Sequence, residues 1–419
     1  METQADQKTF KNYLAFFSGQ QISLLGSSMA QFVIIWWITI ETKSALYLAV
    51  ASFVGFAPMI ILTPFAGVLV DRWNRKAIIG TVDCLQALTT IALIFLFRSG
   101  NISVLYVLVF LAVRSAYQAF NVPAVYAIIP LMVPQDKLSR VNGLNYLLSG
   151  TMMLMGPVVA ATLLVFAKIG EILWVDPATF LVALAALLLI KIPEVKEKKE
   201  KAPFKEEFLE GLAFIKNLRG FVPLVLVATV LNFLLVPLDT LLSYFVIFDH
   251  FGGAEGLALI MACMQGGTLA GGVLMSVIKG FKRKMFTATA FIYLIFVGYA
   301  LVAVTPTGAF WFMALGALLL GFGVAPANVS ILTIIQSVVS VKMQGRVNSV
   351  MITLASAATP LGMVLAGAIV EFTGTVMLFL GCVVAGVFTL TISWFFTDVK
   401  HVEEMENETF NSENQKNST

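Results

Sequence analysis

The sequence predicts an all-α integral membrane protein with twelve transmembrane helices, arranged as two pseudo-symmetric six-helix bundles. Its composition, its long apolar runs and a repeat between its halves all point to this fold class. Of the 419 residues, 59% are hydrophobic and 12% are charged, whereas soluble globular proteins contain roughly 45–50% apolar and about 25% charged residues. Such a chain has too little polar surface to cover a water-soluble body of this length, so we expect its solvent to be lipid.

Twelve apolar runs are long enough to cross a bilayer, which takes roughly 20 residues per helix. They are too long and too continuously apolar for barrel strands of about 10 alternating residues, so helices are expected. The first run is also longer than a signal-peptide core of about 7–15 residues. The expected spans are 13–40, 46–70, 77–97, 103–127, 141–166, 171–191, 221–248, 256–278, 286–305, 309–336, 347–370 and 376–396.

Lysine and arginine residues orient these spans. With twelve spans, both termini share one side with the even-numbered turns, and 23 of the 27 cations lie on that side. Lys43, Arg98 and Lys168 lie on the other side, and Arg114 lies inside a span. The positive-inside rule therefore predicts a multi-pass protein of the cell membrane with both termini in the cytoplasm.

The longest interruption between spans divides the chain into two halves. The expected parts are an N-terminal bundle over 1–191, a cytoplasmic linker over 192–220, a C-terminal bundle over 221–396 and a disordered tail over 397–419. In the linker, Phe204, Phe208, Leu212 and Ile215 recur about every four residues, which is the period of an amphipathic helix. Such a helix can lie on the membrane surface, and a solvated linker is the alternative.

The two halves also share short sequence matches. At an offset of 206 residues, Arg140-Val141-Asn142 matches Arg346-Val347-Asn348, and Gly156 matches Gly362. At an offset of 205, residues 67–71 match residues 272–276. Two parallel halves around a midplane site are a common plan of alternating-access transporters.

Motifs of soluble enzymes are absent from the sequence. It contains no Gly-rich phosphate loop, no Gly-x-Ser-x-Gly and no paired-histidine helix, and His250 and His401 are its only histidines. The three cysteines lie singly in apolar runs, which argues against a disulfide framework or a metal cluster. We therefore expect no enzyme activity, cofactor, metal or nucleic-acid partner. We expect the protein to be a monomer. Its expected partners are the lipid bilayer, protons and a small hydrophobic substrate.

Ionisable residues inside spans are the candidates for transport chemistry, because each costs at least about 2.5–3.5 kcal/mol at mid-bilayer unless it is paired or faces a cavity. Asp239 in the seventh span is the first choice for a carboxylate that burial tunes to exchange a proton, and a structural partner for a hydroxyl or amide is the alternative. Arg114 could bias that proton, bind an anionic group or pin neighbouring helices. Asp83 is the third candidate, but it lies near the basic turn, where a structural pair with Lys76 or its neighbours is favoured.

Uncharged side chains at similar depth are candidates for lining a substrate cavity between the halves. A single amide in a span more often makes a hydrogen bond between helices. The candidates are Gln31, Tyr117, Asn121, Asn145, Asn232, Phe233, Gln265 and Asn328.

The turn between spans two and three resembles a family signature. The cytoplasmic signature of the major facilitator superfamily reads Gly-x-x-x-Asp-Arg-x-x-Arg-Lys, and this turn carries Gly67, Asp71, Arg72, Arg75 and Lys76 at that spacing. The resemblance implies the major facilitator fold and a latch that joins the two halves on the cytoplasmic side. The partner that it implies for Asp71 is Arg346, where a helix N-terminus and a cation would both favour a carboxylate.

Two further segments are similar to motifs of this family. Residues 114–118 resemble a fourth-span motif tied to proton coupling, although the glutamine follows Arg114 at a different spacing from the family form. Gly150, Gly156 and Pro157 are similar to the fifth-span antiporter motif, with alanines in place of its closing glycines. Over about residues 12–397 the chain looks most like the macrolide-efflux branch. The resemblance implies proton-coupled export of bulky, macrolide-like drugs by alternating access.

Two other functions stay open at this point. One is a carrier that exports or imports a physiological lipid, siderophore or metabolite, and the first span does not separate it from a drug exporter. The other is a sensor or scaffold on the same fold that transports nothing. The intact signature and the charges inside spans argue against the second of these.

Overall fold

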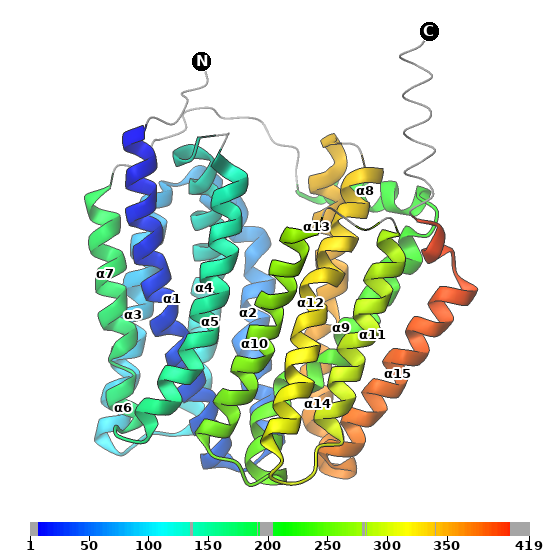
Figure 1. Cartoon of the computed structure of the whole chain (residues 1–419). Coiled ribbons are helices and arrows are strands. Elements are labelled where there is room, and N and C mark those ends of the chain that lie inside the picture. The colour runs from blue at the N-terminus through cyan, green and yellow to red at the C-terminus, as the bar shows by residue number, and fades with distance from the viewer. Residues whose placement is uncertain are drawn as a thin grey trace. The chain divides into compact units, whose positions relative to one another are not determined.

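A computed structural model of the chain describes residues 7–134, 137–190, 192, 204–278, 281, 283–339 and 341–402. Over these residues twelve helices are long and apolar enough to cross a membrane, which confirms the predicted spans (Figure 1). The spans are Thr9–Thr42, Ala45–Thr63, Arg75–Ser99, Val104–Ile129, Val141–Leu164, Ile169–Leu189, Phe221–Asp249, Ala254–Val277, Lys284–Ala303, Phe310–Val338, Met343–Thr373 and Thr375–Phe396.

The first half of the chain contains five long helices and one divided span. The helices are α1 (Gln7–Thr42), α2 (Ala45–Arg72), α3 (Arg75–Ser99), α4 (Val104–Met132), α5 (Leu138–Leu164), α6 (Ile169–Ile172) and α7 (Val175–Leu189). Short polar residues begin two of them, because Ser44 accepts a hydrogen bond from the Tyr47 N–H and Asn74 accepts one from the Ala77 N–H. The signature turn therefore supplies the N-cap of span three.

The second half begins with the linker helix and also contains a divided span. Its helices are α8 (Phe204–Asn217), α9 (Phe221–Tyr244), α10 (Ala254–Val277), α11 (Lys284–Ala303), α12 (Phe310–Val338), α13 (Val341–Ala357), α14 (Thr359–Thr373) and α15 (Thr375–Phe396). A π-helical turn, Phe245–Asp249, extends α9, and a 3-10 turn, Asp398–His401, follows α15. Span eleven divides before Pro360, because proline fits the first turn of a helix but not its interior.

The chain divides into two compact units. The N-terminal unit is Met1–Lys198 with Val246–Phe248 and Gly252–Ala262, and the C-terminal unit is Lys199–Phe245 with Asp249–Phe251 and Cys263–Thr419. In the first unit, α1 lies against α5 and α7, and α3 lies against α4 and α7. In the second, α9 lies against α14 and α15, and α11 lies against α12 and α15. Span for span these are the same pairs, as expected for two pseudo-symmetric bundles.

A glycine of the sequence repeat lies at the same helix contact in each unit. A Cβ atom built on Gly156 of α5 would lie 2.6 Å from the Cβ of Ser28 in α1. A Cβ atom built on Gly362 of α14 would lie 3.2 Å from the Cβ of Val236 in α9. Both contacts join span five of a half to its first span, and the closer approach at Gly156 requires glycine.

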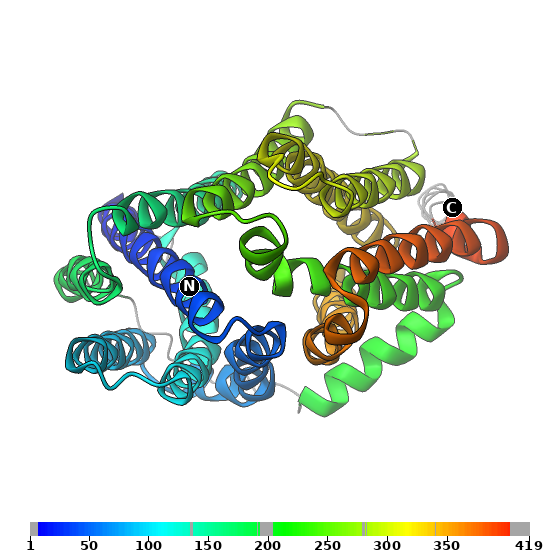
Figure 2. The same cartoon turned by 90° about the horizontal axis from the view of Figure 1, so that it is seen from below.

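The predicted amphipathic linker helix is α8, and it packs against its own unit. Phe208, Leu212 and Ile215 share a core cluster with Val347 and Val350 of α13. Figure 2 shows α8 lying across the direction of the spanning helices of this unit. The structure thus favours a docked helix over a solvated linker, while the charge run over 194–201 lies outside the described residues.

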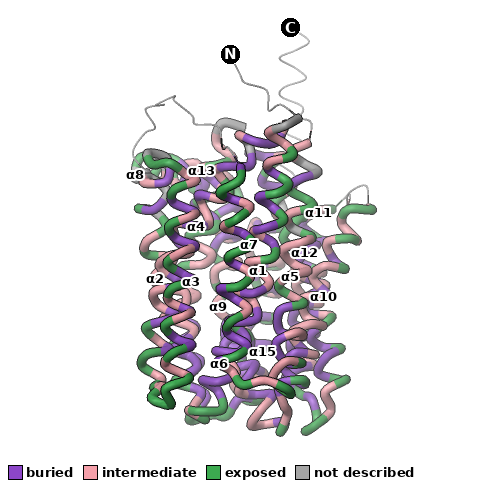
Figure 3. Tube along the Cα trace, turned by 90° about the vertical axis from the view of Figure 1, so that its left-hand side faces the viewer, coloured by how far each residue is buried: buried purple, intermediate pink, exposed green. Residues whose placement is uncertain are grey.

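Burial follows the pattern of a protein in lipid. Large apolar side chains are exposed along the spans, among them Leu189, Phe372 and Phe396, and exposed positions recur along the length of the helices in Figure 3. Exposed apolar side chains of this size are unfavourable in water but are well solvated by the hydrocarbon of a bilayer.

The predicted tail over 397–419 starts with a packed segment. Val399 and Val402 are buried in the same core cluster as α8. Residues 403–419 lie outside those that the structure describes. The boundary of the C-terminal bundle therefore extends beyond the predicted residue 396.

Candidate functional site

The N-terminal unit holds a buried ion pair between α4 and α7. Arg114 donates from Nη1 to Oδ2 of Asp176 at 2.6 Å and from Nη2 to Oδ1 at 3.4 Å. Thr90 of α3 donates to Oδ2 at 2.6 Å, and Ser27 of α1 donates to Oδ1 at 2.8 Å. Four spans therefore meet at one carboxylate, whose charge is matched by Arg114 and whose oxygens are fully hydrogen-bonded.

Asp176 lies inside its span because span six is divided. The span begins at Ile169, and α7 begins at Val175 after a break that follows Ile172. The carboxylate therefore stands in the first turn of α7, at a helix end that favours negative charge. The sequence did not single out Asp176, although it lies within the expected span 171–191, and its pairing with Arg114 was not predicted. The pairing could have been expected, because a cation inside a span such as Arg114 needs an anionic partner. The expected sixth span contains such an anion, Asp176.

Asp83 is a second buried carboxylate, and its partners are amides. Asn121 of α4 donates from Nδ2 to Oδ1 at 2.5 Å, and Gln20 of α1 donates from Nε2 to Oδ2 at 3.3 Å. The Asp83 side chain is 8% exposed. The pair with the basic turn that the sequence favoured is not found within the described part of the chain, so no cation there neutralises this carboxylate.

These amide partners can serve Asp83 in both of its protonation states. A side-chain amide carries two donors and one acceptor, so a turn of the Asn121 amide would present its oxygen to a protonated carboxyl. An ionised carboxylate in an apolar interior is costly without a cation, and binding a proton removes that charge. The geometry around Asp83 is therefore suited to a carboxyl that exchanges a proton.

A polar stripe along α3 links the two carboxylate clusters. Asp83, Gln86 and Thr90 are all buried and follow one another at helical spacings of three and four residues. The Nε2 of Gln86 has no hydrogen-bond partner among the described residues. The stripe begins at Asp83 and ends at the Arg114–Asp176 pair, so one helix face connects them within the N-terminal unit.

Two of the remaining polar candidates of this unit form hydrogen bonds between helices or pack against its core. Asn145 of α5 accepts hydrogen bonds from Gln21 of α1 at 3.4 Å and from Ser149 at 3.1 Å. Tyr117 packs against the apolar core cluster of this unit. Gln31 is exposed.

The basic residues of the signature turn contact backbone oxygens of their own unit. Arg75 donates to the Ala127 carbonyl at 3.2 Å. Lys76 donates to the carbonyls of Ile190 at 2.6 Å and Leu188 at 3.1 Å, which places a cation at the carboxyl end of α7. The side chains of Gly67, Asp71 and Arg72 lie outside those that the structure describes.

Arg346, the predicted latch partner, has an anionic partner in the C-terminal unit. It donates from Nη1 to Oε2 of Glu210 in α8 at 2.5 Å. The close approach of the two helices depends on Gly211, because a Cβ atom there would lie 3.0 Å from the Arg346 carbonyl oxygen. The linker helix therefore contacts the residue for which the family signature implies a latch.

Asp239 of α9 has no partner within the described part of the chain to stabilise its charge. Its side chain is exposed rather than buried, and no hydrogen bond or ion pair reaches it from the residues that the structure describes. The role of Asp239 as a proton carrier therefore stays a prediction. Asn232 and Asn328 are also exposed and Gln265 is half-buried.

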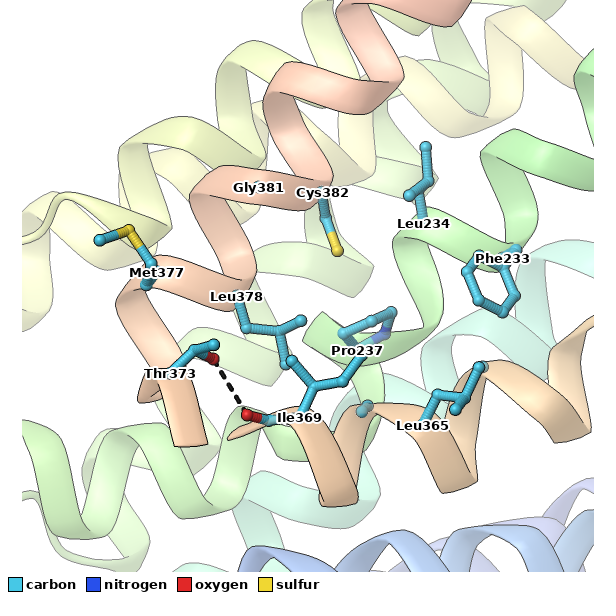
Figure 4. Close-up of a pocket in the computed structure, with 12 residues that line it drawn as sticks. Phe233, Leu234, Pro237, Leu365, Ile369, Thr373, Met377, Leu378, Gly381 and Cys382 are labelled. Carbon is cyan, nitrogen blue, oxygen red and sulfur yellow. Dashed lines mark hydrogen bonds between the residues drawn. The ribbon is translucent and has the colours of Figure 1, made fainter. Parts of the chain in front are cut away.

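Phe233 lines an apolar pocket of about 300 Å³ between α9, α14 and α15 (Figure 4). A residue predicted to line a cavity thus lies at a hollow of the C-terminal unit. Its other lining residues are Leu234, Pro237, Gly362, Leu365, Ala366, Ile369, Thr373, Met377, Leu378, Gly381 and Cys382.

Comparisons with known proteins agree with this fold. The profile of the Major Facilitator Superfamily matches residues 16–351 and 239–416. Macrolide efflux protein A of Streptococcus pyogenes is 27% identical over 84% of this chain and 88% of that protein. Multidrug efflux pump Tap of Mycolicibacterium fortuitum is 26% identical over 81% of this chain and 84% of that protein.

A solved structure shares the fold over most of the chain. The crystal structure of a bacterial homologue of the iron transporter ferroportin matches with a TM-score of 0.72 and 14% identity. The match covers 91% of this chain and 98% of that one. At this identity the likeness concerns the fold alone.

Proposed function

The chain belongs to the Major Facilitator Superfamily, and on this premise we propose that it exports bulky apolar drugs of the macrolide type in exchange for protons. Its family and fold are those of membrane transporters of small molecules. Relatives that are named for macrolide or multidrug efflux, over more than four-fifths of this chain, support the substrate class. Apolar drugs also suit a protein with few charges inside its spans.

The observation that carries proton coupling is the environment of Asp83. Asp83 is buried in span three and its partners among the described residues are amides. Asp176 is matched by Arg114, and Asp239 is exposed. Of the three, Asp83 has most to gain from binding a proton, because that step removes an unmatched buried charge. We therefore assign the proton-carrying role to Asp83 in place of Asp239.

Arg114 has a different role in this scheme. The ion pair with Asp176 fixes the guanidinium beside Thr90, at the end of the α3 stripe that starts at Asp83. Asp176 matches this charge while the pair is closed, so the guanidinium would favour the ionised form of a carboxylate elsewhere on the stripe in a state where Asp176 has moved away. Arg114 would thus help Asp83 to release its proton, as the resemblance to the coupling motif implies.

The cytoplasmic ends of the helices would carry the conformational part of the cycle. In this scheme both termini are cytoplasmic, and Asp71 pairs with Arg346 in one state of the transporter. In the structure Arg346 donates to Glu210 of the linker helix. Glu210 would then hold Arg346 whenever the latch is open.

Transport in proteoliposomes tests the proposal. Purified protein is given a pH gradient, and the uphill movement of a radiolabelled macrolide is followed with and without a protonophore. For an exchange of one proton per drug, a gradient of one pH unit supplies about 1.4 kcal/mol, which sustains a concentration ratio of about 10-fold. Asp83→Asn should lose a driving force of this size and still allow downhill movement.

Two further variants make this test specific. Glu371→Gln removes an exposed carboxylate of α14 and should keep the full drug gradient. Asp239→Asn decides between the two carboxylates: if it abolishes uphill transport while Asp83→Asn keeps it, the assignment to Asp83 is wrong. If the protonophore leaves the drug gradient unchanged in the wild type, proton coupling itself is wrong.

A further inference from the structure

We propose that the pocket between α9, α14 and α15 binds one hydrocarbon chain of a bilayer lipid (Figure 4). This site goes beyond the proposed export of drugs, because its chemistry and size differ from those that a bulky drug needs. Its chemistry, size, depth and opening each favour this occupant.

The wall of the pocket offers a ligand almost no polar group. Among its lining residues, Thr373 and Cys382 carry the polar side-chain atoms. The Thr373 hydroxyl donates to the Ile369 carbonyl oxygen at 3.1 Å, so it is already engaged, and a thiol is a weak donor. Drug pockets orient their ligands with a few well-placed polar groups. A pocket without them suits a chain that has no polar atoms.

The volume of the pocket excludes a large ligand. It measures about 300 Å³, which is the lower end of the range of about 300–1,000 Å³ for ligand pockets. This space accepts a single chain rather than a bulky drug. The pocket is therefore not the transport site of the proposed macrolide substrate.

The length of the pocket matches one leaflet of the bilayer. Its α14 wall runs from Gly362 to Thr373, which is about 16 Å at a rise of 1.5 Å per residue. The hydrocarbon core of a bilayer is about 30 Å thick, so one leaflet is about 15 Å deep. Thr373 and Met377 flank the turn where two spans end, so a chain attached to a head group at that level can extend to Gly362.

The pocket is open on its side, and apolar residues form its rim. Leu365, Ile369 and Met377 are 44%, 40% and 67% exposed. They belong to membrane spans, where exposed apolar side chains are solvated by hydrocarbon. A chain that fills the hollow restores dispersion contacts that its lining atoms would otherwise lack.

The glycine at 381 leaves open space beside the pocket wall. A Cβ atom built on Gly381 of α15 meets no atom within 4 Å, so the space beside this residue is open. Gly362 on the facing α14 is closer to its neighbours, because a Cβ atom built there would lie 3.2 Å from the Val236 side chain. A leucine at 381 would occupy the pocket without a backbone clash.

Photo-crosslinking in nanodiscs tests the site. The full-length protein is placed in phosphatidylglycerol discs, in which a fraction of the lipid carries a diazirine near the end of one acyl chain. We expect adducts on residues 362–382 of the wild type and their loss in Gly381→Leu. Val384→Leu places a leucine about one turn further along α15, at an exposed residue outside the pocket, and should keep the adducts.

Further readouts make every outcome decisive. Gly381→Ala adds one methyl group and should give a smaller loss, which guards against misfolding of the leucine variant. Equal labelling of wild type and Gly381→Leu, at an unchanged unfolding temperature, would overturn the site. If an excess of macrolide removes the lipid adduct from the wild type, the pocket belongs to the substrate and the lipid assignment is wrong. Retention of the adduct supports the lipid.

Discussion

The two units place opposite chemistry on the same arrangement of helices. At the offset of the sequence repeat, the positions of Thr90, Arg114 and Asp176 correspond to Phe296, Leu320 and Cys382. All three residues of the C-terminal unit are buried. The positions that hold a hydrogen-bonded ion pair and its threonine in the N-terminal unit are thus occupied by buried Phe, Leu and Cys residues in the C-terminal unit. The fold itself does not need the charges.

This difference indicates whether the buried charges of the N-terminal unit serve its stability or its function. Replacing a buried ion pair by well-packed apolar residues is often neutral or stabilising, whereas removing one partner is strongly destabilising. Charges that a bundle of this shape can do without therefore point to a function in the N-terminal unit. The C-terminal unit uses the same place for packing, and its Cys382 lines the lipid pocket.

The largest expected effect comes from breaking the ion pair. Arg114→Leu or Asp176→Cys leaves one buried charge unmatched, and each should destabilise the protein by about 3–5 kcal/mol. The double variant reproduces the residues of the C-terminal unit and should recover most of this loss. Denaturant unfolding in detergent micelles measures all three variants.

The same double variant distinguishes folding from transport. We expect it to fold and to lose proton-driven drug export, because the fixed charge at the end of the α3 stripe is gone. Full export by the stable double variant would show that the pair serves structure only. Losses that simply add in the double variant would contradict the pairing itself.

The glycine contacts give a second comparison between the units. Gly156→Ala places a methyl group within 2.6 Å of the Ser28 Cβ, and such overpacking typically costs about 1–3 kcal/mol. The matched Gly362→Ala meets its nearest atoms at 3.2 Å and should cost less. Thermal unfolding of the two variants measures the difference, and an equal or reversed order would contradict the closer approach of α1 and α5.

His250 gives the C-terminal unit a predicted pH dependence. Its side chain is 4% exposed, and burial lowers its pKa, an effect that the nearby Asp249 partly offsets. The unfolded chain therefore binds a proton more readily, and stability should fall as the pH drops below about 6.5, the ordinary pKa of histidine. The slope is at most about 1.4 kcal/mol per pH unit.

A substitution isolates this contribution. His250→Gln should flatten the difference in unfolding free energy between pH 7.5 and pH 5.5, two values chosen about one unit to each side of the ordinary histidine pKa. An unchanged slope would assign the pH dependence to other groups.

The smallest expected effect concerns the linker helix. The Glu210–Arg346 pair is partly exposed, and such pairs contribute about 0.2–1 kcal/mol. Glu210→Gln should therefore change stability little, but it should raise hydrogen exchange in α8. A Gly211→Leu variant should raise it more, because its side chain meets the backbone of Arg346. Unchanged exchange in both variants would contradict the docking of α8.

Much of this fold follows from the sequence, because a bilayer imposes simple rules. The length and apolarity of the runs predicted all twelve spans, and the period of Phe204, Phe208, Leu212 and Ile215 predicted α8. Arg114 and Asp83 stood out because charges are rare inside spans. Each of these features can be predicted from a single segment of the sequence.

The partners of these residues could not be predicted in the same way. Asp176 lies at depth only because span six begins before a helix break; Pro177 favours such a break, but the segment alone does not specify the partner that Asp176 meets there. The exposure of Asp239 depends on how α9 packs against α14 and α15. The lipid pocket is lined by residues of three helices, among them Gly362 and Gly381. Each of these features is a tertiary arrangement of residues far apart in sequence.

Proton movement caused by the drug tests the central claim, proton coupling through Asp83, most directly. Proteoliposomes that contain a pH-sensitive dye and no initial gradient receive a macrolide on one side. We expect a change of internal pH in the wild type, its abolition by Asp83→Asn and its persistence in Glu371→Gln. Macrolide flux without any proton movement in the wild type would contradict the claim.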